Sequence, residues 1–199
     1  MKRVSITGNN SFIGKNLVEY LEKYNARLRE KAYQVTCISQ KNDDWIGLNF
    51  SDYDTILDVT GISHVDEGKL SAKQEEDYYE VNCKLACKTA EKAKQEGVKQ
   101  FIFLSSILVY GEPGKPAMIT RDTIASPVNI YGKSKLIAEE KIKVLSDGQF
   151  QVAIIRLPLV YGPGTESGYK LLSRWSGKLP IIPTIPVKKS MIYIENLCE

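Results

Sequence analysis

The chain has 199 residues, a length that allows one large domain or two small ones. Its composition, 43% hydrophobic and 26% charged, excludes an intrinsically disordered chain. The net charge of +3 comes from 27 basic and 24 acidic residues scattered along the sequence, which does not indicate nucleic-acid binding. The sequence contains no run of about 18 apolar residues, so no membrane-spanning helix is predicted. Its N-terminus turns polar too soon for a signal peptide. We therefore expect a cytoplasmic globular protein with neither nucleic acid nor membrane as partner.

Short apolar segments alternate with longer helical ones through most of the chain. Strands are predicted at residues 4–7, 35–39, 55–60, 101–105 and 151–156, and helices at residues 12–30, 70–96 and 130–145. Segment 41–54 is too short for a full helix and strand, so we expect an abbreviated crossover there. Strands separated by helices indicate βαβ units, and therefore an α/β fold with a parallel sheet and right-handed crossovers.

After residue 156 this alternation gives way to glycine and proline. We predict a helix at residues 167–175, then a loop with three prolines, and a short strand at residues 191–194. A domain division is therefore expected here, with residues 1–156 in one domain and residues 157–199 in a smaller, partial lobe interleaved with it.

The four cysteines are expected to be reduced, partly buried thiols. Cys83 and Cys87 are spaced four apart in a helical segment, but no second cysteine pair joins them, and the only histidine is His64. Metal sites built from such ligands need more donors than this, so we predict no metal.

The first predicted strand leads into the sequence TGNNSFIG, in which Gly8, Ser11 and Gly14 are spaced three apart. Small residues let the backbone turn tightly and approach a pyrophosphate, and the following helix offers free N–H groups to it. A plain turn without a ligand has the same spacing, but a strand before it and a helix after it favour a dinucleotide site. Ser11 replaces the middle glycine and can still cap the helix.

The end of the second predicted strand leaves the choice of dinucleotide open. An acidic residue that binds the adenine ribose is expected there. The sequence instead has Ser39, Gln40 and Lys41, and its carboxylates, Asp43 and Asp44, arrive late. Lys41 suits a 2′-phosphate, so the cofactor is NAD or NADP.

Tyr131 and Lys135 are four residues apart near the start of a predicted helix, and therefore lie on one face of it. An ammonium close to the phenol, together with an oxidised nicotinamide, would lower the tyrosine pKa from its usual value of about 10. Tyr131 would then exchange a proton with a substrate hydroxyl during hydride transfer. Ser106, at the end of a strand, is placed to hydrogen-bond the same oxygen. A Tyr-x-x-x-Lys pair alone is more often a solvated helix face, and it gains weight here from the serine and the dinucleotide turn.

The chain resembles the extended short-chain dehydrogenases/reductases, in their NAD-dependent sugar-nucleotide epimerase/dehydratase group. The similar segments are TGNNSFIG, YDTILDVTGISH, FIFLSSILVYGE, SPVNIYGKSKLIAEE, IIRLPLVYGPG and KKSMIYIENL. The resemblance implies a Rossmann-type doubly wound sheet with a small substrate lobe, and Ser106, Tyr131 and Lys135 as the catalytic set, with Tyr131 and Lys135 also contacting the cofactor. It further implies that the cofactor is bound by Gly8, Asn10, Ser11, Phe12, Ile13, Gly14, Ser39, Thr60, Gly61 and Pro158.

The same resemblance narrows the reaction. Dehydratases of the family have an Asp-Glu pair after the catalytic serine or threonine, whereas this chain has Ile107 and Leu108, so water elimination is disfavoured. A nucleotide-sugar 4-epimerase is the leading interpretation. The alternatives are an NAD(P)H-dependent keto-sugar reductase and a non-catalytic dinucleotide-binding regulatory protein, although such proteins usually lose the tyrosine or the lysine.

The residues expected on the substrate side depart from the family pattern. Leu159 replaces an asparagine that often contacts substrate, and Lys189 replaces the arginine expected at the nucleotide diphosphate. His64 is expected to line the cleft or pack, and Tyr78 and Tyr79 to pack on their helix.

The length of the chain is short compared with that of members of the family it resembles. Its members continue beyond the KKSMIYIENL segment and often dimerise through the helices predicted at residues 70–96 and 130–145. We therefore expect a chain whose substrate lobe is cut short, and a possible homodimer.

Overall fold

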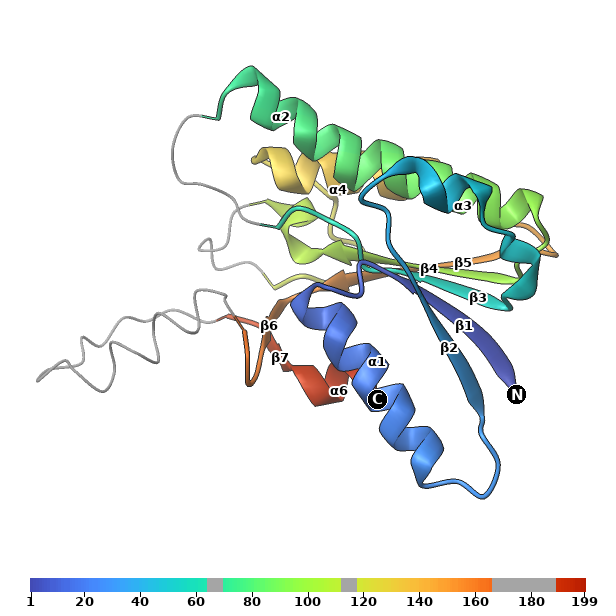
Figure 1. The fold of residues 1–199 in the computed structure, drawn as a ribbon. Coiled ribbons are helices and arrows are strands. Elements are labelled where there is room, and N and C mark those ends of the chain that lie inside the picture. Colours follow the sequence, from blue (N-terminus) through green and yellow to red (C-terminus); the bar gives the residue numbers. More distant parts are fainter. Residues whose placement is uncertain (64–69, 112–117, 166–188) are drawn as a thin grey trace, which may run out of the picture.

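A computed structural model describes residues 1–63, 70–111, 118–165 and 189–199. Five parallel strands form its central sheet, in the spatial order β2-β1-β3-β4-β5 (Figure 1). They are β1 (Lys2–Thr7), β2 (Tyr33–Ile38), β3 (Thr55–Asp58), β4 (Gln100–Ser106) and β5 (Gln151–Leu157). The five predicted strands are thus confirmed, with shifts of one or two residues at most of their ends.

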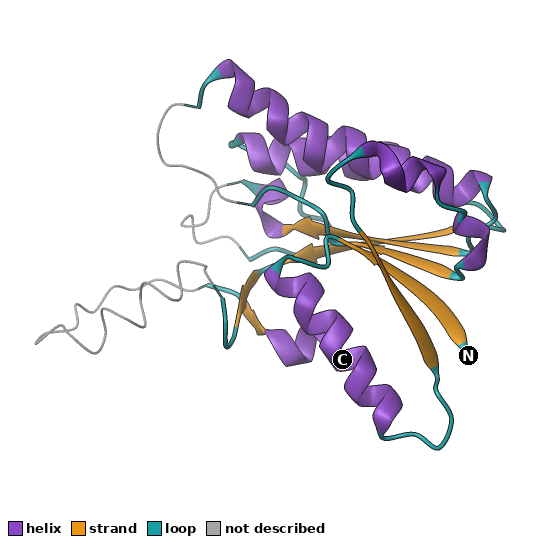
Figure 2. Ribbon diagram, in the orientation of Figure 1, coloured by secondary structure: helices purple, strands orange, loops and turns teal. Residues whose placement is uncertain are grey.

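Helices cover both faces of the sheet (Figure 2). One face carries α1 (Phe12–Ala26), and the other carries α2 (Ala72–Tyr79), α3 (Ala86–Gln95) and α4 (Ile130–Lys143). Between α2 and α3 the backbone continues as a π-helical turn, η3 (Glu80–Leu85). The long helix predicted at residues 70–96 is therefore one continuous helix that contains a π-helical segment. This is the predicted doubly wound α/β architecture.

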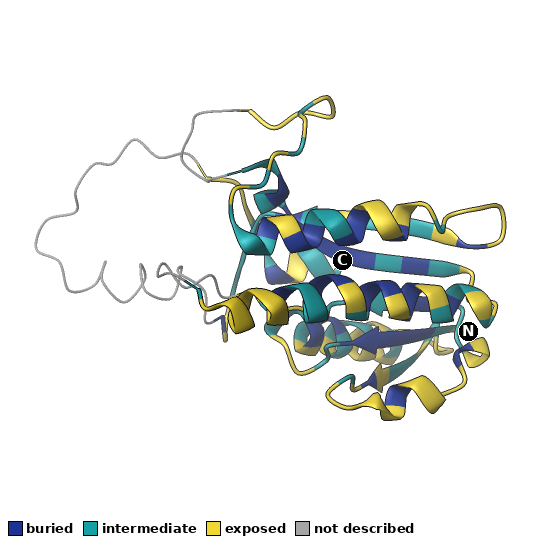
Figure 3. Ribbon diagram, turned by 90° about the horizontal axis from the view of Figure 1, so that it is seen from above, coloured by how far each residue is buried: buried dark blue, intermediate teal, exposed yellow. Residues whose placement is uncertain are grey.

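Alternate residues of the strands supply two apolar layers. On the α3–α4 face, Ile56, Phe101 and Phe103 are fully buried in the larger cluster. On the α1 face, Val4 and Ile6 pack with α1 in the smaller one. Buried and exposed residues alternate along α3 and α4 (Figure 3), as expected for helices that are covered on one side. The inner strands β1, β3 and β4 therefore have two largely covered faces, whereas the edge strands β2 and β5 keep exposed residues such as Gln34 and Ile155.

The first helix ends at Ala26, four residues before the predicted end. The cause is Asn25, whose side-chain amide donates to the carbonyl of Tyr33 and accepts from the N–H groups of Ala32 and Tyr33. These bonds turn the chain directly towards β2. Helical periodicity cannot reveal them, because they join residues seven and eight positions apart.

The abbreviated crossover at residues 41–54 is confirmed. Two short 3₁₀ turns, η1 (Asp43–Gly47) and η2 (Phe50–Asp52), fill it, and Trp45 and Phe50 anchor it in the larger apolar cluster. No further strand pairs with β2 in the described residues, so β2 forms an edge of the sheet.

The chain after β5 forms a small second sheet from β6 (Leu159–Tyr161) and β7 (Met191–Tyr193). The strand predicted at residues 191–194 ends one residue early because Ile194 begins the helix α6 (Ile194–Cys198). Neither β6 nor α6 was predicted. The helix α6 packs on α1, and Cys198 joins the smaller apolar cluster. The helix predicted at residues 167–175, the proline-rich loop after it and His64 lie outside the described residues.

All four cysteines are free. Cys83 and Cys87 are buried and Cys198 is half-buried, but Cys37 is exposed, so the expectation that all four are partly buried is wrong for Cys37. Within the described part of the chain, no helix is long and apolar enough to cross a membrane.

Candidate active site

The glycine-rich turn joins β1 to α1 at the carboxyl end of the sheet. Gly8 has a φ of 64°, and a Cβ there would lie 2.8 Å from the backbone nitrogen of Thr60. A Cβ at Gly14 would lie 2.4 Å from the carbonyl oxygen of Gly8, so any larger residue would force the turn open. The Ser11 hydroxyl accepts from the N–H of Gly14 at 3.1 Å, which confirms the expected N-cap.

The turn fits an anionic ligand for two reasons. The first N–H groups of α1 have no partner within the helix, and the helix dipole adds positive potential at this end. The first turn of α1 also carries no acidic side chain that would repel an anion.

Just after the end of β2, the side chain of Gln40 forms hydrogen bonds with neighbouring elements of the fold. Gln40 donates from Nε2 to Thr89 Oγ1 at 2.6 Å, and its Oε1 accepts from Thr60 Oγ1 at 2.8 Å. Its neighbours Ser39 and Lys41 are exposed. Gln40 therefore connects the chain after β2 to α3 and to the segment after β3.

Ser106 and Tyr131 come together at the carboxyl end of β4. Ser106 is the last residue of β4, and Tyr131 is the second residue of α4. Their side chains are close enough for the Ser106 hydroxyl to lower the pKa of Tyr131. Asn129 caps α4 by accepting from the N–H of Gly132 at 2.8 Å, which places Tyr131 in the first turn of the helix. A strand end and a capped helix start thus bring the two hydroxyl groups into contact.

Gly132 is an important residue that the sequence reasoning missed. A Cβ on it would lie 2.5 Å from the carbonyl oxygen of Leu108, in the 3₁₀ turn η4 (Ile107–Tyr110) that follows Ser106. Only a glycine lets α4 lie this close to η4. A glycine directly after a candidate catalytic tyrosine was the available signal, because glycine weakens a helix unless packing requires it.

Lys135 is buried one turn further along α4. Its Nζ donates to the carbonyl oxygen of Leu104 at 3.0 Å and to that of Thr60 at 3.5 Å, and lies 4.5 Å from the centre of the Phe103 ring. Burial lowers the pKa of Lys135 to about 8, although Asp58 and Glu139 act in the opposite direction. The ammonium is therefore held by strand carbonyls and close to its titration point at neutral pH.

The pKa of Tyr131 is raised above its usual value of 10.0. Burial is the main cause, the hydrogen bond with Ser106 partly offsets it, and Tyr78 adds to it. In the chain by itself the direction is thus opposite to the one expected with the lysine and an oxidised nicotinamide, because the Lys135 ammonium is directed at Leu104 and Thr60. The buried position of Tyr78 agrees with its expected packing role.

Thr60 and Gly61 lie between the glycine-rich turn and Lys135. A Cβ on Gly61 would lie 3.2 Å from Lys135 Nζ and 3.0 Å from Asn82 Oδ1. Asn82, in the π-helical turn, is buried and bonds to both the N–H and the carbonyl of Ile62, at 2.7 and 3.0 Å, and to Ser134 Oγ at 3.2 Å. Asn82 therefore ties the segment after β3 to α4. Sequence reasoning missed it, because an asparagine inside a charged helix looks like a surface residue.

The other residues predicted to bind the cofactor or substrate differ in their exposure and in their position in the chain. Asn10 is exposed, and Phe12 and Ile13 are half-buried in the first turn of α1. Pro158 is half-buried between β5 and β6, and Lys189 is exposed two residues before β7.

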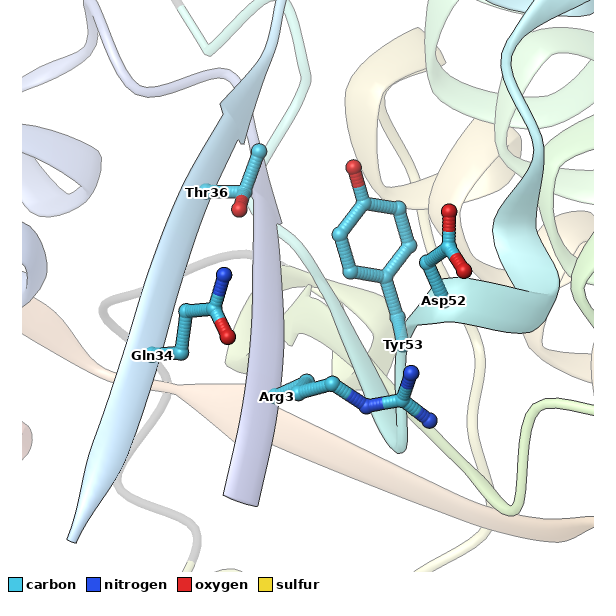
Figure 4. Close-up of a pocket in the computed structure, with 5 residues that line it drawn as sticks. All are labelled: Arg3, Gln34, Thr36, Asp52 and Tyr53. Carbon is cyan, nitrogen blue, oxygen red and sulfur yellow. The ribbon is translucent and has the colours of Figure 1, made fainter. Parts of the chain in front are cut away.

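Two shallow pockets in the described residues lie elsewhere. One, of about 360 Å³, is lined by Arg3, Gln34, Thr36, Asp52 and Tyr53 (Figure 4). The other is lined by residues at the amino ends of strands, among them Lys2, Thr55 and Gln100. Neither contains a predicted site residue, so the candidate site is defined by side-chain chemistry at the carboxyl end of the sheet.

Comparison with known proteins places this geometry in context. UDP-glucose 4-epimerase of Vibrio cholerae is 32% identical over 217 residues, which cover 100% of this chain and 65% of that protein. The chain thus spans less than two thirds of this relative. Among solved structures, UDP-glucuronic acid 4-epimerase from Bacillus cereus, in complex with UDP-glucuronic acid and NAD, matches 98% of this chain and 70% of its own, with a TM-score of 0.77 and 22% identity.

A second solved structure has the same fold and a different printed activity. The dTDP-4-dehydrorhamnose reductase of Bacillus anthracis, in complex with NADP, matches 100% of this chain and 68% of its own, with a TM-score of 0.74 and 23% identity. At these identities the structural likenesses establish the fold. Residues 4–180 match the family model, and the chain therefore belongs to the NAD-dependent epimerase/dehydratase family.

Proposed function

We propose that this chain is the cofactor-binding and catalytic part of an NAD-dependent sugar-nucleotide 4-epimerase. The observation that carries the proposal is the proximity of Ser106 and Tyr131, with Lys135 buried one turn further along α4, at the sheet end that holds the glycine-rich turn. The similarity to a UDP-glucose 4-epimerase over the whole chain supports it.

The residues present fit a dinucleotide. The crowding around Gly8 and Gly14 keeps the turn compact, so its backbone and the start of α1 would lie against the pyrophosphate, with Asn10, Ser11, Phe12 and Ile13 beside it. Ser39, Thr60, Gly61 and Pro158 would contact the remaining parts of the cofactor. Bound NAD would supply the acceptor and donor of hydride, and the positive charge that favours the Tyr131 phenolate.

The chain's own side chains would manage the proton. Tyr131 would take the proton of a sugar hydroxyl and later return it. Ser106 would donate a hydrogen bond to the same sugar oxygen, and Lys135 would keep a positive charge near the phenolate. Because burial raises the pKa of Tyr131, the phenol stays protonated at neutral pH in the chain by itself. We therefore expect base catalysis only when the cofactor is oxidised.

The substrate class we propose is a UDP-hexose. The similarity over the whole chain to the UDP-glucose 4-epimerase of Vibrio cholerae supports this choice. Lys189, exposed before β7, is proposed to contact the diphosphate as a point charge, within a substrate lobe that begins after residue 156. We also propose that the protein acts in the cytoplasm, consistent with its four free thiols, and forms a homodimer through the outer faces of α2, α3 and α4.

Turnover of UDP-glucose and UDP-galactose by the purified protein with NAD, followed by the stereochemistry of the product, tests this proposal. Tyr131→Phe should lower turnover by about 10²–10⁴-fold and leave NAD binding intact. Tyr24→Phe, near the end of α1 that is away from the glycine-rich turn, is the control and should retain turnover. Stoichiometric oxidation of NADH by a keto-sugar, without epimerisation, would instead assign a reductase. Unchanged activity in Tyr131→Phe would contradict the mechanism.

A further inference from the structure

Asp58, the last residue of β3, is a fully buried carboxylate. Its Oδ1 accepts from the hydroxyl of Thr7 and, at 3.2 Å, from the backbone N–H of Thr60. Its Oδ2 is buried without a hydrogen-bond partner among the described residues. A buried carboxylate with an unused oxygen is costly unless a positive charge lies near it.

The strand register places Asp58 on the face of the sheet that carries Lys135. Asp58 is paired with Phe103 of β4, so the two side chains point to the same face. The Lys135 ammonium lies over the Phe103 ring, 4.5 Å from its centre. Both charged groups also bond to Thr60, Asp58 to its N–H and Lys135 to its carbonyl.

Glu139 is the other carboxylate close to Lys135, and its oxygens are already engaged. It lies one turn further along α4, where both of its oxygens accept from the Arg156 guanidinium and Oε1 also accepts from Ser105 Oγ. Tyr131 on α4 faces the site as a neutral phenol. Among the described residues around Lys135, Asp58 is thus the carboxylate that has an oxygen without a hydrogen-bond partner.

We propose that Asp58 is the buried counter-ion of Lys135 and positions its ammonium at the carboxyl end of the sheet. Asp58 raises the pKa of Lys135 against the effect of burial. Burial also raises the pKa of Asp58, and the Lys135 charge is the largest of the effects that oppose this rise. The importance of this pair for turnover rests on the proposed function, but the pairing itself does not.

The sign of the effect follows from the environment of Lys135. Its pKa of about 8 already lies below the usual 10.5 because burial disfavours the charged form. Without the Asp58 charge, burial would act with less opposition, and the pKa would fall further. At neutral pH a larger share of the Lys135 side chain would then be the neutral amine, which cannot stabilise a phenolate.

Asp58→Asn tests the pairing, because the amide keeps the shape and the acceptor for Thr7 and Thr60. The titration of Lys135 is followed by NMR of ¹³C-labelled lysine, with the resonance assigned by its loss in Lys135→Arg. We expect the midpoint to move down by about one pH unit in Asp58→Asn. Asp54→Asn, which removes a carboxylate paired with Arg3 just before the other end of β3, should leave it unchanged. An unmoved Lys135 midpoint in folded Asp58→Asn would overturn the proposal.

A reciprocal measurement covers the case in which Asp58→Asn does not fold. In Lys135→Met, the carboxyl carbon of Asp58 should titrate about one pH unit higher than in the unmodified chain. A midpoint that stays in place would also overturn the proposal. If the coupling is present but no nucleotide sugar is turned over, the proposed function fails and the counter-ion role stands.

Discussion

Adding a single methyl group at Gly132 tests whether the start of α4 has to lie directly against the turn after Ser106. The new Cβ would lie 2.5 Å from the carbonyl oxygen of Leu108 and 3.0 Å from Pro127 Cβ. Leu108 is two residues after Ser106, and Tyr131 directly precedes Gly132. Gly132→Ala must therefore push apart the two segments that bring Ser106 and Tyr131 together.

The size of the displacement follows from the contact distance. Ordinary contact begins at 3.4 Å, so 3.4 minus 2.5 gives a separation of 0.9 Å. A misplacement of about 1 Å in reacting groups lowers the rate by about 10²-fold. Overpacking costs about 1–3 kcal/mol, whereas alanine favours the helix over glycine by about 1 kcal/mol, so the free energy of unfolding should fall by about 2 kcal/mol at most.

The assay combines turnover with guanidinium denaturation. We expect activity to fall far more than stability in Gly132→Ala. Gly47→Ala is the control, because nothing lies within 4 Å of a Cβ added there. If Gly132→Ala keeps both the turnover and the stability of the unmodified protein, the close packing of α4 on η4 has no part in positioning Tyr131.

Two further predictions concern stability. Ser11→Ala removes the N-cap acceptor for Gly14 and should lower the free energy of unfolding by about 1 kcal/mol, measured by chemical denaturation; an unchanged value would show that the cap is replaced by solvent. The exposed Asp147 carboxylate binds Lys94 and the N–H groups of Gln149 and Phe150, which lower its pKa from 3.8 to about 2. Its contribution to stability is therefore complete above pH 3.8 and lost as the pH falls towards about 2. Asp147→Asn should flatten the acid-denaturation profile in that window, and a profile identical to that of the unmodified chain would refute this reasoning.

The sheet was predictable because each of its inner strands is buried on both faces, which leaves an uninterrupted apolar run such as Phe101–Leu104 in the sequence. The ends of elements were less predictable, because they depend on distant partners. Asn25 ends α1 through bonds to Ala32 and Tyr33, and β6 exists only by pairing with β7 about thirty residues later. Local periodicity contains no information about either contact.

The candidate site shows the same division. The grouping of Ser106, Tyr131 and Lys135 at one end of the sheet was predictable, because the end of an apolar strand and a helical spacing of four are both visible in the sequence. Asp58 and Asn82 were not, since their roles arise from strand register and from the contact between the π-helical turn and α4. The direction of the Tyr131 pKa was also beyond sequence reasoning, because it depends on how deeply the phenol is buried.

Thr60 contacts the glycine-rich turn, Asp58, Lys135 and Gln40, and so connects them. Its backbone nitrogen lies against Gly8 and donates to Asp58, its carbonyl accepts from Lys135, and its hydroxyl lies within hydrogen-bond distance of Gln40. The turn proposed to bind phosphate and the lysine proposed to act in catalysis are thus fixed to the same residue. Because Gln40 is committed to this inner network, its side chain is not free to bind a ribose. We therefore expect any discrimination between NAD and NADP at the end of β2 to depend on its exposed neighbours, Ser39 and Lys41.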